Sequence, residues 1–487
     1  MPNQVLALHR VSPRCYDLSR VRTGNVRDQL LRSTVIVNAL YSEGLIGNGW
    51  PLLVYGAGPA GMNAAMLAAE RRIDAVVLER TQKLFQTIFL CAWRRVDPTE
   101  YDWPHAHWLS GAFPRSGKNI PLSQPYGMTA FTLAAAWRKK WRDFENKMKV
   151  PDLVGKVEVL HGVNANNLTL SDTGLGALLS ATGPWDATNP ARSTRHFGAV
   201  LSCIGYGDEL VGEEPRNGRW NNYAGPRFWH DNDTVTPNAP LPRTITNVVI
   251  SGGGDGAMQD FQRLASSQAL FGRELYTKLR QLLRETGLDA LRSFPNPDQR
   301  LRFLSAEETG RRAFSWAPDR YGVPDAMAQW HDAFAGPVDA AVASWPDKVA
   351  KAVADKLFRT ELLDSKLKIR WVMQDPTPGY AYALNRFLSL VLLALARKCQ
   401  PSLDITVHNS SSIQTIAPAE AGHECVSAPG CIGKKHVVLI APRCGHGATA
   451  IEEADLIIIR HGLEPRPQLL GGRLPVPEQI SPFDLPH

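Results

Sequence analysis

A short glycine-rich segment near the N-terminus carries the clearest chemistry in this sequence. An apolar run, Leu52 to Tyr55, leads into Gly56-Ala57-Gly58-Pro59-Ala60-Gly61. In a strand–turn–helix unit of this kind, the first glycine permits a tight turn and the second lets the backbone approach a pyrophosphate, while the third lets the helix pack closely on the strand. The helix then presents free N–H groups and the positive end of its dipole to the phosphates. The segment therefore predicts a dinucleotide-binding turn formed by Gly56, Gly58, Pro59, Ala60 and Gly61.

An acidic residue stands where such a turn needs one. A second apolar run, Ala75 to Leu78, ends at Glu79, which is 23 residues after Gly56 and is followed by Arg80. A carboxylate at the end of the second strand accepts hydrogen bonds from the adenosine ribose hydroxyls and disfavours a 2′-phosphate. We therefore expect Glu79 and Arg80 to belong to the cofactor site, and we expect NADP not to bind there.

A second segment repeats the pattern about 195 residues later. The apolar run Val248 to Ile250 precedes Gly252, Gly254 and Ala257, which match G-x-G-x-x-A. Such a unit normally continues into a strand about 20 residues after the glycines, but the next clear strand, Ile369 to Met373, is more than a hundred residues on. Either a helical insertion interrupts the unit, or the second turn has lost nicotinamide binding.

The amino-acid sequences of both turns resemble those of known flavoproteins. GAGPAG followed by VVLER resembles FAD-binding flavoproteins. The GGGD turn resembles the NAD(P)H-binding turn of thioredoxin-reductase-like and flavin-monooxygenase-like proteins, which have two dinucleotide-binding domains. The resemblance implies FAD at the first turn and NAD(P)H at the second. The C-terminal Gly-Asp segment of that family, which contacts the flavin ribityl chain and pyrophosphate, is not recognisable in this sequence.

Candidates for proton or thiol chemistry follow Glu79. In the family that the chain resembles, the loop after the second strand passes near the flavin, so Trp103, His105, His107 and Trp108 could line the flavin or substrate pocket. A histidine there could donate or accept a proton because its pKa is near neutrality; the alternative is a packed aromatic loop with surface histidines. Cys91 lies roughly where flavin disulfide reductases carry a cysteine pair. It is alone, so we expect either a single redox thiol or a buried, inert one.

Composition and charge exclude several other classes. The chain has 487 residues, of which 44% are hydrophobic and 21% are charged, as in globular proteins with two or three domains. No apolar run reaches the roughly 18 residues that span a bilayer, and the N-terminus lacks a signal-peptide core, so we expect a cytoplasmic protein without a membrane partner. The net charge is +7, and the basic residues are scattered along the chain, so we expect no nucleic-acid partner. The seven cysteines form no C-x-x-C pair, and we expect no metal site. The oligomeric state stays open.

The pattern of elements predicts an α/β protein with two Rossmann-like dinucleotide-binding domains and a large helical insertion in the second. The expected divisions are an N-terminal helical extension over 1–50, an FAD-binding Rossmann-like domain over 51–215, a second, NAD(P)-binding-like domain over 216–470 with the insertion at about 262–366, and a tail over 471–487.

The function that this organisation indicates is an FAD-dependent oxidoreductase. Hydride or electrons would pass between NAD(P)H or an organic donor and a small-molecule substrate that the sequence does not identify, and a monooxygenase reaction is the first hypothesis within that class. Two alternatives stay open: a dinucleotide-binding sensor or scaffold without turnover, and an NAD-linked enzyme without flavin.

Overall fold

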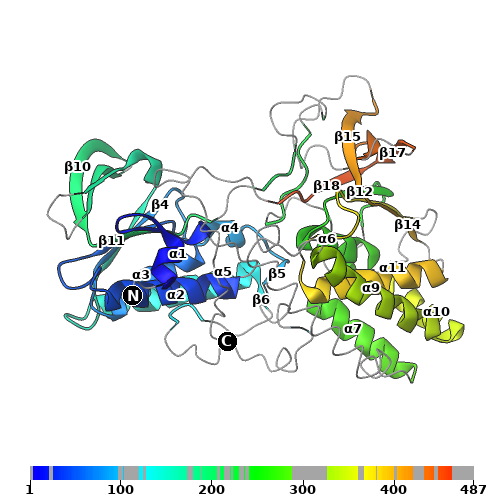
Figure 1. The fold of residues 1–487 in the computed structure, drawn as a ribbon, viewed down its shortest axis with the longest axis horizontal. Coiled ribbons are helices and arrows are strands. Elements are labelled where there is room, and N and C mark those ends of the chain that lie inside the picture. Colours follow the sequence, from blue (N-terminus) through cyan, green and yellow to red (C-terminus); the bar gives the residue numbers. More distant parts are fainter. Residues whose placement is uncertain are drawn as a thin grey trace. The chain divides into compact units, whose positions relative to one another are not determined.

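The computed structural model divides the chain into two compact units (Figure 1). The described residues of the first unit lie within 1–98 and 111–208, and those of the second lie within 99–110 and 209–464. The structure describes residues 4–20, 26–96, 103, 120–123, 128–172, 179–186, 188–205, 209–212, 220, 223–229, 235, 241–287, 326–359, 367–379, 381–399, 403–420, 433–443 and 448–462. Each unit is described by itself below.

A six-stranded sheet forms the centre of the first unit. Its order is β1 (Arg10–Ser12), β2 (Cys15–Asp17), β11 (Ala199–Ser202), β3 (Leu52–Tyr55), β4 (Ala75–Glu79) and β7 (Val157–His161). Strands β2, β11, β3, β4 and β7 run parallel to one another, and β1 is antiparallel to β2. The parallel strands β3 and β11 are buried along their whole length, as expected for continuous apolar runs covered on both faces.

Helix α3 (Pro59–Glu70) packs on strands β3, β4 and β7 of this sheet, and α2 (Val26–Ser42) packs on α3. The other helices of the unit are α1 (Gln4–His9), η1 (Leu18–Arg20), α4 (Gln86–Phe89) and α5 (Ala130–Met148). Helix α2 packs on α3, where the buried Asn63 amide donates to the Leu30 carbonyl and to the hydroxyls of Ser33 and Thr34 at 2.9–3.2 Å. Residues before Leu52 therefore form part of the sheet and its helical layer. The predicted helical extension anticipated α2 and missed the strands β1 and β2.

An antiparallel three-stranded sheet covers the other face. It consists of β8 (Thr169–Asp172), β9 (Leu179–Asp186) and β10 (Asn189–Phe197) in the order β10-β9-β8, and it is visible in green at the edge of the unit in Figure 1. Its buried Trp185 and Phe197 share a core with Leu53 and Tyr55 of β3. A short ribbon, β5 (Arg95–Val96) with β6 (Met128–Thr129), and a single turn, η5 (Ala165–Asn167), complete the described elements.

The second unit repeats this layering. Its sheet has the order β14 (Leu403–His408), β13 (Leu367–Val372), β12 (Asn247–Ser251) and β18 (Leu456–Ile459), with all strands parallel. The antiparallel sheet β15 (Ser411–Pro418), β16 (His436–Pro442) and β17 (Ala450–Ala454) shares a core with one face. The other face packs on helices α6 (Asp255–Ala265), α7 (Gly272–Glu285), α9 (Ala326–Ser344), α10 (Asp347–Leu357) and α11 (Ala383–Cys399), with the turn η6 (Ser267–Ala269) after α6.

Strands β12 and β13 are neighbours in the sheet although β12 ends at residue 251 and β13 begins at 367. The described residues between them are mostly helical, so a helical insertion does separate the two strands. Its helices α7 and α10 bury apolar faces that include Leu275, Leu279, Val353 and Leu357. The predicted α/β fold with parallel sheets is confirmed. Within the described residues, no helix combines the length and the hydropathy that crossing a membrane requires.

Candidate functional site

The first glycine turn joins β3 to α3 and has the geometry that its spacing predicts. Gly56 has φ +94°, and a Cβ there would meet the Cys203 carbonyl oxygen at 2.8 Å. A Cβ on Gly61 would overlap the carbonyl oxygen of Gly56. A Cβ on Gly58, in contrast, would have no heavy atom within 4 Å. Packing within the protein therefore requires glycine at positions 56 and 61. Gly58 instead leaves an open space in front of the helix.

The N-terminus of α3 faces this open space without a capping side chain. Gly58 is the N-cap residue, Pro59 is the first helical residue, and the first turn contains no acidic residue. The backbone N–H groups of Ala60 and Gly61 belong to the set that no residue within a helix can satisfy. Together with the helix dipole, they make this end of α3 suited to an anion such as a pyrophosphate.

Glu79 is fixed against the turn by three hydrogen bonds. Its Oε2 accepts the N–H of Ala57 at 2.8 Å, and its Oε1 accepts the N–H and the hydroxyl of Thr81, both at 2.8 Å. The carboxylate thus lies at the carboxyl end of β4, beside the turn, where an adenosine ribose would be recognised. Arg80 follows with an exposed side chain.

Replacing Glu79 tests its role in the adenosine site. We expect Glu79→Ala to weaken FAD binding by about 1–3 kcal/mol because a charge-assisted bond to ribose hydroxyls is lost, and Glu79→Gln to weaken it less because an acceptor remains. Equilibrium titration of the flavin-free protein with FAD measures both. Glu158→Ala, which removes a half-exposed carboxylate of β7 that pairs with Arg195 of β10, is the control. Equal dissociation constants for Glu79→Ala and the parent protein would place Glu79 away from the ribose.

A polar row that the sequence did not indicate lies at the same edge of the sheet. Asp17, Ser202 and Tyr55 are paired residues on the parallel strands β2, β11 and β3, and all three are buried. The Asp17 carboxylate accepts the N–H and hydroxyl of Ser19 at 2.8 and 2.7 Å, and the buried Ser202 hydroxyl has no partner among the described residues. Ligands of open parallel sheets bind outside the carboxyl ends of the strands. The row therefore adds polar groups to the cofactor edge.

The residues proposed for chemistry after Glu79 have different outcomes. His105, His107 and Trp108 lie outside the described residues. Cys91 is fully buried and in no disulfide, so a reaction of its thiol would require the surrounding chain to open. Trp103 agrees with the alternative of a packed aromatic residue, because its ring is buried in the apolar core of the second unit, with its centroid 4.8 Å from that of Phe387.

The second glycine turn joins β12 to α6 and repeats the first. Gly252 has φ +134°, and a Cβ there would overlap the carbonyl oxygen of Arg460, just after β18. Gly254 is the N-cap residue of α6, with the extended conformation that Gly58 has, and the buried Ala257 takes the position of Gly61. The predicted residues of this turn are therefore brought together at the carboxyl edge of the second parallel sheet.

In both turns, the carbonyl of the second turn residue accepts a hydrogen bond from a loop that an arginine holds in place. In the first unit, the Phe85 N–H donates to the Ala57 carbonyl at 3.1 Å, and Arg138 of α5 donates to the Leu84 carbonyl at 2.8 Å. In the second unit, the Gly379 N–H donates to the Gly253 carbonyl at 2.7 Å, and Arg386 of α11 donates to the Pro378 carbonyl at 3.0 Å. The equivalent contacts show that the second turn keeps the construction of the first.

Asp255 distinguishes the start of α6 from that of α3. Its Oδ1 accepts the Asn385 amide at 2.7 Å and the Tyr382 N–H at 3.1 Å, and Gln259 donates to its Oδ2 at 3.2 Å. Burial raises the pKa of Asp255 to about 6, against the lowering effect of the bonds from Asn385 and Tyr382. These bonds turn the carboxylate toward α11, so it ties the turn to the helix layer.

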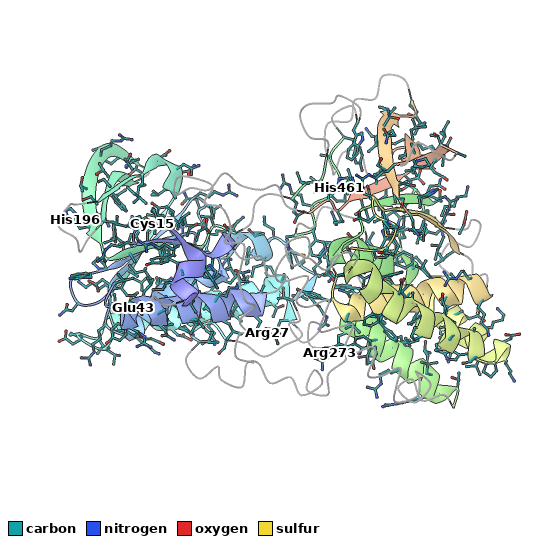
Figure 2. All side chains as sticks on the ribbon, in the orientation of Figure 1. Cys15, Arg27, Glu43, His196, Arg273 and His461 are labelled. Carbon is teal, nitrogen blue, oxygen red and sulfur yellow. The ribbon has the colours of Figure 1, made fainter. Side chains whose placement is uncertain are left out.

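A serine–histidine pair also lies at the carboxyl edge of the second sheet. Ser251 ends β12, and its hydroxyl is 2.8 Å from Nε2 of His461, which is labelled in Figure 2. Burial lowers the pKa of His461, because it disfavours the charged imidazolium relative to the neutral imidazole. Arg460, immediately before it, pairs with the buried Asp260 of α6 at 2.7 Å and fixes the end of β18 to the helix.

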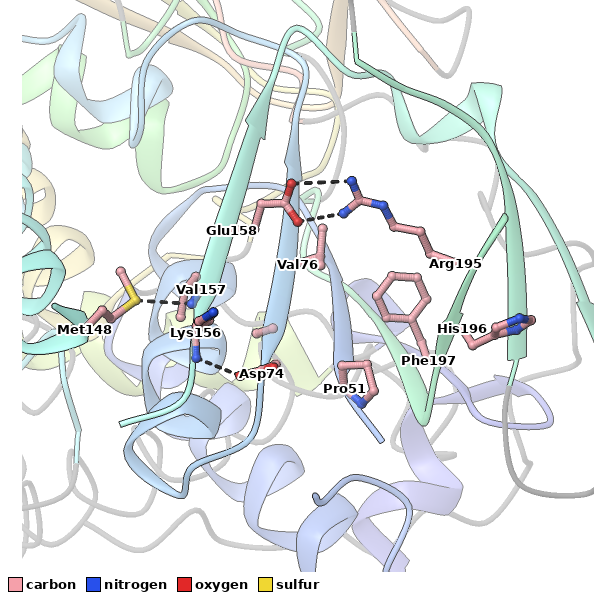
Figure 3. Close-up of a pocket in the computed structure, with 11 residues that line it drawn as sticks. Pro51, Asp74, Val76, Met148, Lys156, Val157, Glu158, Arg195, His196 and Phe197 are labelled. Carbon is pink, nitrogen blue, oxygen red and sulfur yellow. Dashed lines mark hydrogen bonds and ion pairs between the residues drawn. The ribbon is translucent and has the colours of Figure 1, made fainter. Parts of the chain in front are cut away.

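An open hollow of about 640 Å³ lies at the opposite edge of the first sheet (Figure 3). Pro51, Asp74 and Lys156, which line it, immediately precede β3, β4 and β7. Arg195 on its wall pairs with Glu158 at 2.6 Å. Because it adjoins the amino ends of the strands, this hollow is separate from the glycine turn and its cofactor edge. Within the described ranges, no three histidine, cysteine or acidic side chains gather as metal ligands would.

Comparison with known proteins finds similarity at the level of structure. No protein-family model and no curated protein sequence matches the chain. The bacillithiol disulfide reductase of Bacillus cereus matches with a TM-score of 0.40 and 10% identity, over 85% of this chain and 78% of its own. The thioredoxin reductase of Lactococcus lactis matches with a TM-score of 0.37 and 11% identity, over 86% of this chain and 80% of its own. The thioredoxin reductase of T. acidophilum matches with a TM-score of 0.34 and 11% identity, over 86% of this chain and 79% of its own.

The resemblance to thioredoxin-reductase-like proteins that the sequence indicated is thus found again among solved structures. The identities are near 10% and the TM-scores are 0.40 or below. The features of this chain that bear on its function are the two glycine turns and the groups at the carboxyl edges of the two parallel sheets.

Proposed function

We propose that the chain is an FAD-dependent oxidoreductase that takes reducing equivalents from a nicotinamide dinucleotide. The observation that carries this proposal is the open space at Gly58 in front of the uncapped α3, with Glu79 fixed beside the turn. An anion site with a ribose acceptor beside it suits the adenosine diphosphate half of a dinucleotide.

The residues of the first unit fit FAD at both ends of its pyrophosphate. Backbone N–H groups at Ala60 and Gly61 would hold the phosphates, and Glu79 would accept from the ribose hydroxyls. Asp17 and Ser202, at the same strand edge, would meet the part of the cofactor that extends across β3 toward β11 and β2. The N-terminal strand β2 would thus supply the acidic residue that the related proteins carry in a C-terminal Gly-Asp segment.

Each part of the protein then has a defined task. Bound FAD would supply hydride and single-electron transfer, which amino-acid side chains do not provide. The first unit would bind and orient it, and the turn at Gly252 to Ala257 would bind the nicotinamide dinucleotide. His461, whose Nε2 lies 2.8 Å from the Ser251 hydroxyl, is our candidate for accepting or donating a proton at the second site.

The substrate belongs to the finer part of the proposal. A small molecule would accept the electrons, with oxygen as one candidate and a monooxygenase reaction as the corresponding outcome. Internal dithiol chemistry is disfavoured, because the sequence has no C-x-x-C pair and Cys91 is fully buried.

The absorption spectrum of the purified full-length protein tests the proposal. We expect the two visible bands of oxidised flavin and release of about one FAD per chain on denaturation, as a stoichiometric cofactor requires. A colourless protein that also fails to take up added FAD would overturn the flavoprotein assignment. Tight binding of NAD to such a protein would instead favour an NAD-linked enzyme. Bound FAD that no nicotinamide reduces would favour a sensor.

A further inference from the structure

The hollow at the amino edge of the first sheet has an apolar floor. Val76 of β4 and Glu158 of β7 are paired residues of neighbouring parallel strands, so their side chains lie on the same face of the sheet. Val76 and Phe197 of β10 line the hollow and belong to the core that this face shares with the antiparallel sheet. The half-buried Pro51 and Met148 extend this apolar lining. The volume of about 640 Å³ lies in the range of small-molecule sites.

Hydrogen bonds hold the walls of the hollow in place. Arg195 donates to both carboxylate oxygens of Glu158, at 2.6 and 3.4 Å. The Met148 sulfur accepts the N–H of Val157 at 3.1 Å, which fixes a flexible side chain against the wall. Figure 3 marks these contacts with dashed lines. The hollow is therefore formed before any ligand arrives, which lowers the cost of binding one.

The backbone brings an acidic and a basic residue together at one end of the hollow. A Cβ on Gly155 would lie 2.7 Å from the carbonyl oxygen of Ile73, so the chain before β7 lies directly against the chain before β4. The Ala75 N–H donates to the Lys156 carbonyl at 2.8 Å, and the Lys156 N–H donates to Oδ1 of Asp74 at 2.8 Å. The positions of Asp74 and Lys156 are thus set by main-chain contacts.

Both of these residues keep a charged group for a ligand. Within the described residues, neither Oδ2 of Asp74 nor the ammonium of Lys156 has a hydrogen-bond or ion-pair partner, and both side chains are exposed. The other two charges of the hollow, on Arg195 and Glu158, neutralise each other. The hollow therefore offers one anion and one cation beside an apolar floor, and its complement is a small molecule with an ammonium, a carboxylate and an apolar part.

We propose that this hollow binds an apolar α-amino acid, with the carboxylate of the ligand on Lys156, its ammonium on Asp74 and its side chain over Val76 and Phe197. The site lies at the opposite end of the strands from the first glycine turn, so the proposal does not depend on the flavin or on a nicotinamide donor.

Equilibrium dialysis of the purified full-length protein against radiolabelled L-phenylalanine tests the proposal. Excess FAD is present, so that the probe cannot occupy the cofactor edge. We expect saturable binding of about one molecule per chain at or below millimolar concentration. The competitors are 3-phenylpropionate, which lacks the ammonium, phenethylamine, which lacks the carboxylate, and glycine, which lacks the side chain. Each should compete at least about fivefold more weakly than unlabelled L-phenylalanine, because each loses one of the three contacts.

Substitution of the two charged residues locates the bound probe. Lys156→Met and Asp74→Asn should each weaken the binding of L-phenylalanine at least about fivefold, since each removes one ion pair. Asp74→Asn keeps an amide oxygen for the Lys156 N–H, and Lys156→Met keeps that N–H, so both variants should fold. The matched controls are Lys149→Met and Asp152→Asn, at exposed positions nearby that do not line the hollow. They should bind the probe as the parent protein does.

Three results would overturn the proposal. One is the absence of saturable L-phenylalanine binding up to about ten millimolar. Another is equal competition by 3-phenylpropionate, which would show a site for simple anions. The third is binding that survives both Lys156→Met and Asp74→Asn, which would place the probe elsewhere on the protein. Flavin content is measured in the same samples, and its absence would count against the proposed function and not against the amino-acid site.

Discussion

The Gly58→Val variant is expected to fold and to contain no FAD. Gly58 has φ −73° and ψ −177°, an extended conformation that valine adopts readily, and a Cβ there meets nothing within 4 Å. The valine side chain would nevertheless occupy the space between the turn and an approaching pyrophosphate. We expect the flavin content to fall from about one per chain to below about one-tenth, because the backbone can no longer approach the phosphates.

The control for this substitution is Gly47→Val. Gly47 also has open space around the position of a Cβ, and it lies before β3, at the amino end of the strand that leads to the turn. It should keep the parent flavin content. Because bound FAD itself stabilises the folded state, folding is compared by circular dichroism and urea midpoints of the flavin-free proteins. Stoichiometric FAD in a folded Gly58→Val protein would show that the pyrophosphate does not lie at this turn.

The first turn could be predicted from the sequence because all of its parts are local. The strand, the glycines, the helix and Glu79 fall within 28 residues, from Leu52 to Glu79. Each part has a pattern of its own, and their spacing is set by one βαβ unit. The structure adds only what spacing cannot show, such as the bond from the Ala57 N–H that fixes the carboxylate.

The equivalent residue of the second unit could not be predicted in the same way. Its strand, β13, is separated from β12 by more than a hundred residues of mainly helical chain, so the distance rule that located Glu79 has no counterpart. Only the sheet register identifies Met373 as the residue in that position. The sequence therefore indicated a second dinucleotide-binding turn, but it could not indicate which residue would contact the ribose of a dinucleotide bound there.

The N-terminal strands show a different limit of sequence patterns. Strand β2 has only three residues, which is too short for an alternating pattern, and its place in the sheet depends on pairing with β11 almost two hundred residues later. The same holds for Trp103, where an aromatic side chain near histidines is compatible with a pocket or with a packed loop. Apolar partners on α7, α9 and α11 bury it, and those contacts are set by tertiary packing.

The Gly254→Val variant is expected to keep its flavin and to lose reduction by a nicotinamide dinucleotide. Gly254 has φ −90° and ψ −173°, so valine is tolerated by the backbone as at position 58. Its side chain would stand between the turn and the pyrophosphate of the donor. FAD content should not change, because the first turn and the second belong to separate units. The matched control is Gly336→Val, at an exposed position of α9 with open space around it.

The measurement is the loss of flavin absorbance after anaerobic mixing with NADH or NADPH in a stopped-flow instrument. In the parent protein we expect reduction at millimolar donor, and in Gly254→Val a rate at least about a hundredfold lower at the same donor concentration, since the phosphates lose their backbone contacts. Reduction that survives in Gly254→Val would mean that the nicotinamide enters elsewhere and that this turn is only a strand–helix connection. Failure of both donors to reduce the parent protein would remove the nicotinamide from the proposed function, leaving an oxidase with an organic donor or a flavin-binding sensor. Together the results decide whether the second turn, which repeats the construction of the first, binds a nicotinamide dinucleotide.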